Sequence, residues 1–325
     1  MLKLGIRFAI ALLIIGVLVW IGDGIAAHWA VMSQLTPLAA VLALVAITLG
    51  RTVMAYKWLR LMRCFGAVMP LSIATQIYCA ANIWGLVLPS TLGVDAVRTV
   101  CASREGLPAR DVIASILVER GIGFIIGASL CLVSVLYLAE QAVLGSTLYW
   151  TGWFAAALIV GLVIGMWLSF SEWLHGFVHD RLLRRVREGR IARTLRDLHS
   201  AYLAFRSHRG ELLLFLGLTV VENLVTGAAF WLIAWGLGVS VGLVDVLAVA
   251  FVANLVSRVP ISFGGGLGVF EAMFVLGMSV IGIPTTEALS VALLGHLFKI
   301  LSWLPWWIVY TLRAGRIGVP ASDRA

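Results

Sequence analysis

Eight charged residues lie in or beside long apolar stretches of the sequence, and they are the first candidates for chemistry. A charge at the centre of a membrane span costs roughly 2.5–3.5 kcal/mol when it has no partner. We therefore expect these residues either to pair with one another or to line a wet cavity that receives a charged headgroup. Four are acidic and four are basic, so ion pairing across two broken segments is the natural structural solution. The eight are Asp95, Arg98, Glu119, Arg120, Glu222, Arg258, Glu271 and Lys299.

The basic members of this set favour an anionic ligand. Arg98 and Arg258 suit a phosphate group because a guanidinium donates two hydrogen bonds in a fork. Ser90 and Ser262 can add hydroxyl donors, and backbone amides near Gly264, Gly265 and Gly266 can add more where a half-helix begins. The carboxylates that would balance the arginines or bind an amino group are Asp95, Glu119, Glu222 and Glu271.

Two segments interrupt apolar runs where a membrane helix would otherwise continue. Each begins near an asparagine, contains a proline and glycines, and ends at an acid: residues 82–95, which start at Asn82, and residues 258–271, which follow Asn254. Proline removes a backbone donor, and glycine permits angles that other residues resist. Broken backbone in hydrocarbon is tolerated only when it is buried in protein or lines a wet cavity. Paired breaks in two halves of a chain therefore predict a transport site.

Composition defines the class of protein. The chain has 325 residues, of which 61% are hydrophobic and 12% charged, and ordinary soluble domains carry about twice that charged fraction. A formal net charge of +8 would suggest a nucleic-acid partner for a soluble protein. Here basic residues between spans set orientation instead, so we expect no nucleic acid. The four cysteines show neither a metal spacing nor a disulfide framework.

The basic clusters between the apolar runs predict the topology through the positive-inside rule. Residues 71–103 are flanked by basic residues on both sides, so they are predicted to dip into the membrane from the cytoplasm and return. Residues 244–283 are predicted to do the same from the opposite side. The fold class is therefore an all-α polytopic membrane protein with about six full spans and two re-entrant helical hairpins. We expect it in a bacterial cytoplasmic membrane, with both termini in the cytoplasm.

The two halves are predicted to form an inverted-topology repeat. Residues 1–146 would make the first membrane repeat and residues 147–325 the second, each in the order span, span, hairpin, span. The first span is predicted over residues 4–22 and is followed by a short loop over residues 23–37. Because the halves start on opposite sides of the membrane, their broken helices would meet near the midplane, where such repeats place a site.

Residues 172–211 form the most basic region of the chain. They hold nine arginines against five acids, and apolar residues recur at helical spacing within 191–205. We expect an amphipathic helix on the cytoplasmic membrane surface. A charged connector packed on its own protein is the plainer alternative.

Signals for catalysis are weak. The glycines at 264–268 lack the Gly-Lys-Ser/Thr ending of a nucleotide-binding loop, so no ATP site is expected. His296 and Lys299 lie one helical turn apart and could relay protons, although a helix-packing role is the plainer interpretation. Because no catalytic constellation or metal spacing stands out, we expect a protein that is not an enzyme and that has no catalytic residue, no metal and no cofactor.

At the two breaks the sequence resembles the lysylphosphatidylglycerol synthase transmembrane-region family, also called the flippase-like domain family. The first signature covers Asn82–Arg98 and is followed by Glu119–Arg120. The second covers Pro260–Glu271 and is followed by Glu287–Ala288 and Lys299. The resemblance extends over nearly the whole chain.

The sequence also departs from the pattern of that family at three points. Val94 stands within a stretch that is often Gly-Gly-Asp in the family, Glu119 replaces an aspartate, and Lys299 replaces an arginine. The replacements at Glu119 and Lys299 keep the charge of the family residue, so they do not identify the substrate. The resemblance implies a membrane domain that moves lipids between leaflets, including aminoacylated phosphatidylglycerol, and relatives are associated with glycolipid, polyprenyl-phosphate or hopanoid traffic. It also implies that this chain is the translocating part alone, without the soluble aminoacyl-transferase of longer members.

These observations favour a lipid flippase or scramblase with phosphate-containing membrane lipids as partners. The first alternative is a non-transporting membrane subunit that docks a cytoplasmic synthase through residues 172–211. The second is an intramembrane lipid-modifying enzyme, which lacks a visible catalytic constellation. The sequence leaves open whether the chain forms a homo-oligomer.

Overall fold

A computed structural model describes residues 13–86, 91–141, 204–258 and 267–314, together with residues 156, 157, 159–161 and 164. The regular elements among these residues are helical. They are α2 (Gly24–Met32), α3 (Pro37–Arg63), α4 (Leu71–Gly85), α5 (Thr91–Arg104), α6 (Ala109–Gln141), the 3₁₀ turn η2 (Phe205–Ser207), α10 (Arg209–Gly236), α11 (Leu243–Ser257), α12 (Val269–Val280) and α13 (Thr285–Ala314).

Four of these helices are long and apolar enough to cross a membrane: α3, α6, α10 and α13. A helix satisfies its own backbone groups, which is why sequences of this composition cross lipid in that form. The predicted all-α polytopic class is therefore confirmed. The predicted number of six full spans is not tested, because most of residues 142–203 lie outside the described part of the chain.

The N-terminal region differs from the prediction of one span followed by a loop. The helix Leu13–Ile21 ends in a sharp bend of 83°, and α2 then continues where a loop was expected. Asp23 has φ 64° and Gly24 has φ 84°, so two successive residues in the left-handed region turn the chain. His28 holds the corner in place, since its Nδ1 lies 3.2 Å from the Oγ of Ser290 in α13.

The two predicted breaks both fall between short helices that pack against each other. In the first half, α4 ends at Gly85 and α5 begins at Thr91. In the second half, α11 ends at Ser257 and α12 begins at Val269. These helices have 15, 14, 15 and 12 residues, which is short for a complete crossing of about 20 residues. Whether the pairs re-enter from opposite sides stays a prediction.

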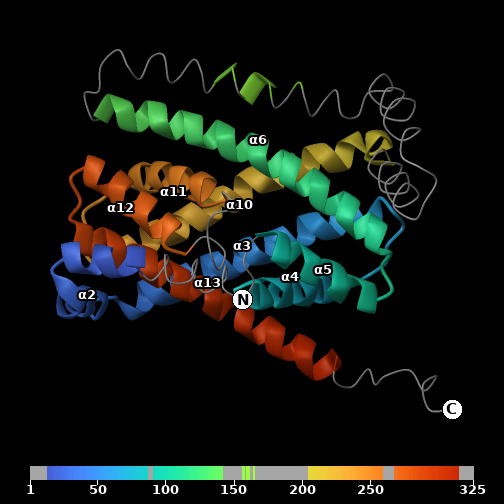
Figure 1. Cartoon of the computed structure of the whole chain (residues 1–325), viewed down its shortest axis with the longest axis horizontal. Helices are drawn as coiled ribbons and strands as arrows, with labels where there is room; N and C mark the ends of the chain where they lie inside the picture. Colours follow the sequence, from blue (N-terminus) through green and yellow to red (C-terminus); the bar gives the residue numbers. More distant parts are fainter. Residues whose placement is uncertain are drawn as a thin grey trace.

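The helices of the two halves pack in matching ways. In Figure 1, α3 and α10 run through the middle, with α4 and α5 toward one end and α11 and α12 toward the other. Helix α6 of the first half packs on α11, and α13 of the second half packs on α4, so each half ends against the broken pair of the other half. Exchanging α3, α4, α5 and α6 for α10, α11, α12 and α13 reproduces this pattern of contacts. The interlocked arrangement means that neither half is an independent layer.

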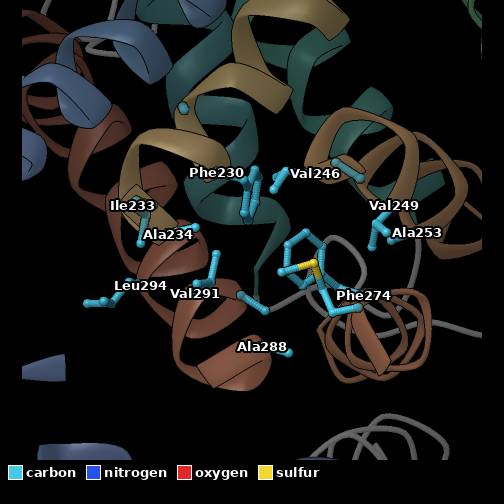
Figure 2. Packing of buried hydrophobic residues seen from close by; sticks show 14 of the residues in the cluster. Phe230, Ile233, Ala234, Val246, Val249, Ala253, Phe274, Ala288, Val291 and Leu294 are labelled. Atoms are coloured by element: carbon cyan, nitrogen blue, oxygen red, sulfur yellow. The ribbon is translucent and has the colours of Figure 1, made fainter. Parts of the chain in front are cut away.

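The largest apolar cluster lies around α10, α11, α12 and α13 and positions the second broken pair. Phe230, Phe270 and Phe274 are fully buried and lie with ring centroids 5.2–5.7 Å apart. Figure 2 shows Phe230 and Phe274 among smaller side chains such as Val249 and Val291. Because rings of this size dominate the apolar area of a core, the cluster fixes α12 against α10 and α13.

Candidate functional site

The first group of charges joins α5 to α6 and is called the α5–α6 charge cluster: Asp95, Arg98, Glu119 and Arg120. Arg98 donates from Nη1 to Glu119 Oε2 at 2.8 Å and from Nη2 to Asp95 Oδ1 at 3.3 Å. Arg120 donates from Nε to the other oxygen of Asp95 at 2.7 Å. Two cations therefore face two carboxylates, and the cluster is electrically neutral.

Aromatic residues enclose the α5–α6 charge cluster on the side of α3 and α4. The hydroxyl of Tyr78 donates to Glu119 Oε1 at 2.7 Å, and the guanidinium of Arg98 lies 4.9 Å from the centroid of the Tyr78 ring. Arg98 also lies 5.7 Å from the centroid of the Trp58 ring, and only 3% of Arg98 is exposed. The predicted phosphate-binding role of Arg98 stays a prediction, since carboxylates already engage two of its nitrogens here.

The second group lies between α3 and α10, the two central helices. The ammonium of Lys57 donates to Glu222 Oε2 at 2.5 Å and to Thr219 Oγ1 at 3.1 Å. Lys57 is 4% exposed and Glu222 is 9% exposed, so this ion pair is withdrawn from solvent. Arg51, also in α3, is 9% exposed and forms no ion pair among the described residues. Glu222 is therefore the carboxylate partner of Lys57, and Arg51 has none.

The third group ties the start of α12 to α13. Glu271 is fully buried; its Oε1 pairs with Nδ1 of His296, and its Oε2 accepts a hydrogen bond from the backbone N–H of Gly268 at 2.7 Å. Gly268 has φ 84°, a conformation that favours glycine, and Glu271 satisfies the amide that this turn exposes. Glu271 thus stabilises the end of the second break through its contacts with Gly268 and His296.

Lys299 lies one turn beyond His296 on α13 and has aromatic rather than anionic neighbours. Its ammonium lies 4.6 Å from the centroid of Phe270 and 5.0 Å from that of Phe230. Within the described part of the chain Lys299 has no salt bridge.

Arg258 caps the end of α11 and reaches across to the first half. Its Nη1 donates to the backbone carbonyl of Gly123 in α6 at 2.9 Å. A Cβ atom added at Gly123 would lie 3.3 Å from that nitrogen, and one added at Gly127 would lie 3.6 Å from it. Two glycines on one face of α6 therefore give the guanidinium room to approach the helix.

The structure corrects the expectation that the membrane charges pair across the two hairpins. Among the described residues no ion pair joins α4 or α5 to α11 or α12. The pairs form within the first half, within the second half, between the central helices, and between Glu105, which follows α5, and Arg313 in α13. The physical reason is local geometry, since Arg98 reaches Asp95 three residues away on the same helix face.

The remaining predicted site residues fall into two sets. Asn82 donates to the carbonyl of Tyr78 at 2.8 Å, which is a bond within its own helix, and the carbonyl of Asn254 accepts from Ser257 at 2.9 Å. Neither contact brings these asparagines into the charged groups. The other four predicted residues lie outside the described part of the chain, and they are Ser90, Ser262, Gly264 and Gly265.

Sequence reasoning missed Arg51 and Lys57 as site residues. In the sequence, Lys57 is followed closely by Arg60 and Arg63, and such a basic cluster predicts a cytoplasmic loop that sets membrane orientation. The helix continues to Arg63, however, so Lys57 lies inside the protein. Arg51 lies in the middle of the same apolar run, and a charge at that position is itself a sufficient signal.

The described residues contain no group of three or more histidine, cysteine or acidic side chains placed to hold a metal ion. Their charged side chains form ion pairs, and Arg51 and Lys299 form none.

Long apolar helices and a charged interior together define a polytopic helical membrane protein whose polar groups face inward. The sequence model of the family described as lysylphosphatidylglycerol synthase TM region matches residues 6–305. The chain therefore belongs to that family, a membrane domain associated with lipids, as the two breaks suggested. No curated protein matches the sequence significantly.

Proposed function

We propose that this protein moves an anionic, aminoacylated or polyprenyl-phosphate-linked lipid, glycosylated or not, between the leaflets of the bacterial cytoplasmic membrane. The observation that carries the proposal is a set of two buried cations in α3, of which only one has a carboxylate partner. Arg51 is 9% exposed and Lys57 is 4% exposed, and among the described residues only Lys57 forms an ion pair, with Glu222. Buried charges of this kind are costly in a membrane protein and mark substrate pathways.

The packing of the helices supports a transport mechanism. Two broken pairs, α4 with α5 and α11 with α12, have matching partners in the two halves. Membrane transporters built from inverted repeats place their sites where such broken helices approach each other, and they work by rocking one half against the other. Under this proposal the headgroup enters between the two halves while the acyl or prenyl tails stay in lipid.

The proposal assigns different tasks to the charged groups. Arg51, Lys57 and Arg258 attract the headgroup, whereas the neutral α5–α6 charge cluster braces the first broken pair. No chemical step on the lipid is proposed, and lipid movement would run downhill or be coupled to an ion.

Reconstitution into liposomes tests the proposal. Tagged lipids of several headgroup classes are placed in both leaflets, and a membrane-impermeant reagent measures how fast the protected inner-leaflet tag becomes accessible. We expect faster transfer for one anionic or glycosylated class than for zwitterionic lipid. Arg258→Gln should abolish that transfer, whereas the matched change Arg110→Gln should preserve it, because the Arg110 side chain is 60% exposed at the start of α6.

A contrary outcome would be equal, protein-independent transfer across the whole panel from protein shown to be folded. That result would favour the docking-subunit alternative. The residues that would make the docking surface, 172–211, lie almost entirely outside the described part of the chain.

A further inference from the structure

The cations at α3 and α13 outnumber the carboxylates that are free to balance them. Glu222 pairs with Lys57, and Glu271 pairs with His296 and with the backbone amide of Gly268. Among the described residues Arg51 and Lys299 form no ion pair, so two positive charges lack a carboxylate partner. The sequence of residues 259–266 between α11 and α12 adds no aspartate or glutamate.

Arg51 is the least satisfied member of this group. Its Nη1 donates at 3.0 Å to the sulfur of Met54, a weak acceptor, and its buried Nε has no hydrogen-bond partner in the described structure. Arg51 is 9% exposed, and an arginine side chain stays protonated at any ordinary pH. Burying a charge without a partner is strongly unfavourable, so an anion is the missing partner that the chemistry calls for.

A second unsatisfied donor lies next to Arg51. The hydroxyl of Thr226 in α10 is buried and has no hydrogen-bond partner among the described residues. A Cβ atom built on Gly50, the residue before Arg51, would lie 3.2 Å from that oxygen. Helix α3, which carries Arg51, packs against α4, α10 and α13. The place is therefore the junction of α3, α4, α10 and α13.

We propose that this junction, centred on Arg51 with Thr226, Lys57 and Lys299, binds a phosphate dianion, that is, the headgroup of a lipid phosphomonoester. A phosphomonoester carries about −1.5 to −2 charges near neutral pH and offers three acceptor oxygens. It would neutralise the two surplus charges and satisfy both unpartnered donors. A phosphodiester carries a single charge and would leave one cation unbalanced.

This inference deepens the proposed function and rests on it for the lipid nature of the ligand. Phosphate chemistry alone would also fit free inorganic phosphate, so the test must separate the two sources. Dioctanoyl phosphatidic acid is a phosphomonoester, and dioctanoyl phosphatidylglycerol is a phosphodiester with the same acyl chains. Dioctanoylglycerol has the chains without the phosphate, and inorganic phosphate has the charge without the chains.

Binding of these four probes to the purified full chain in detergent is measured by titration calorimetry at neutral pH. We expect phosphatidic acid to bind at least tenfold more tightly than phosphatidylglycerol and inorganic phosphate, with no binding of dioctanoylglycerol. Arg51→Gln should reduce the affinity for phosphatidic acid at least tenfold, while Arg51→Lys should retain most of the preference because it keeps the charge. Lys299→Met supplies a second variant if Arg51→Gln fails to fold, and it should remove part of the preference for the monoester.

Several results would overturn the inference. Equal affinity for the monoester and the diester would refute the dianion, and inorganic phosphate binding as tightly as phosphatidic acid would refute the lipid source. Unchanged affinity in folded Arg51→Gln or Lys299→Met protein would refute the location. Selective binding without any lipid transfer in liposomes would support this site and refute the proposed function. Transfer of a phosphodiester lipid at the same rate in the Arg51→Gln variant would support the proposed function and refute this site.

Discussion

At the scale of single residues, the buried charges of this protein have two kinds of environment. The α5–α6 charge cluster is neutral and enclosed by Trp58 and Tyr78, whereas Arg51 and Lys299 form no ion pair among the described residues. Breaking a balanced, buried pair leaves an uncompensated charge, which costs more than the pair itself contributes. The two environments therefore respond differently to substitution: the first loses stability, and the second loses function as well.

The Lys57–Glu222 ion pair gives the first prediction. Removing one partner, as in Lys57→Met or Glu222→Gln, should destabilise the folded protein by about 3–5 kcal/mol because the other charge stays buried. The double variant should recover part of that loss, which reveals the coupling between the two residues. Reversible unfolding of purified protein in mixed micelles measures each free energy.

The Arg60–Glu211 pair is the matched control for that cycle. It joins the same two helices, but its side chains are 27% and 25% exposed. Its coupling should be no more than about 1 kcal/mol, as for pairs in contact with water. Equal coupling energies for the two pairs would contradict the burial argument.

Tyr78 gives a second prediction at this scale. Tyr78→Phe removes the hydroxyl that donates to Glu119 at 2.7 Å and leaves a carboxylate oxygen without that donor. The expected loss of stability is about 1–3 kcal/mol. Tyr56→Phe is the control, because Arg60, which donates to the Tyr56 hydroxyl, also binds Glu211 through two other nitrogens. Thermal unfolding of the two variants should separate them, and identical melting temperatures would remove Tyr78 from the cluster.

At the scale of elements, close helix packing depends on glycines at particular positions. A Cβ atom added at Gly295 in α13 would lie 2.2 Å from Cε1 of Phe230, and Phe230 is fully buried by other rings. Such an atom needs a shift of the ring or of the helix. By contrast, a Cβ atom at Gly217 in α10 would meet nothing within 4 Å.

The paired substitution of these glycines is the third prediction. Gly295→Ala should destabilise the protein by about 1–3 kcal/mol through overpacking. Gly217→Ala should instead be neutral or stabilise it by up to about 1 kcal/mol, because alanine is the better helix former. Unfolding midpoints of the two variants check the sign, and a stable Gly295→Ala protein would mean that Phe230 has room to move.

Element positions were largely predictable from the sequence, but side-chain partners were not. The predicted hairpin over 71–103 corresponds closely to α4 and α5, and the hairpin over 244–283 to α11 and α12, because apolar runs and proline–glycine breaks are local signals. The partner of Glu222 is Lys57, 165 residues away, and no local pattern encodes that contact. The bend at Asp23 was missed because a left-handed aspartate has no signal in composition.

At the scale of the whole molecule, the last long helix of each half packs on the broken pair of the other half. Helix α6 packs on α11, and α13 packs on α4, so a rocking motion of one half must change both contacts. Within each broken pair, by comparison, the helices contact each other directly. A Cβ atom at Gly85 in α4 would lie 3.3 Å from Cβ of Val94 in α5, which is close to the separation that a disulfide spans.

Cross-linking therefore distinguishes movement between halves from movement within a broken pair, and this is the fourth prediction. Residue pairs are changed to cysteine in a background without the four native cysteines. Gly127→Cys with Leu255→Cys joins α6 to α11, since a Cβ atom at Gly127 would lie 3.3 Å from Leu255 Cδ1. Gly85→Cys with Val94→Cys joins α4 to α5. Oxidation of the first pair should stop lipid transfer in liposomes and reduction should restore it, because the contact between halves can no longer change.

Oxidation of the second pair should leave transfer unchanged, because α4 and α5 are expected to move together as one body. A mass shift after proteolysis verifies that each disulfide has formed. If lipid still crosses when α6 is fixed to α11, the halves do not rock at that contact, and the headgroup must pass through a path that stays open throughout. If only the α4–α5 link stops transfer, the moving part is the broken pair itself, and the interlocked long helices are its rigid frame.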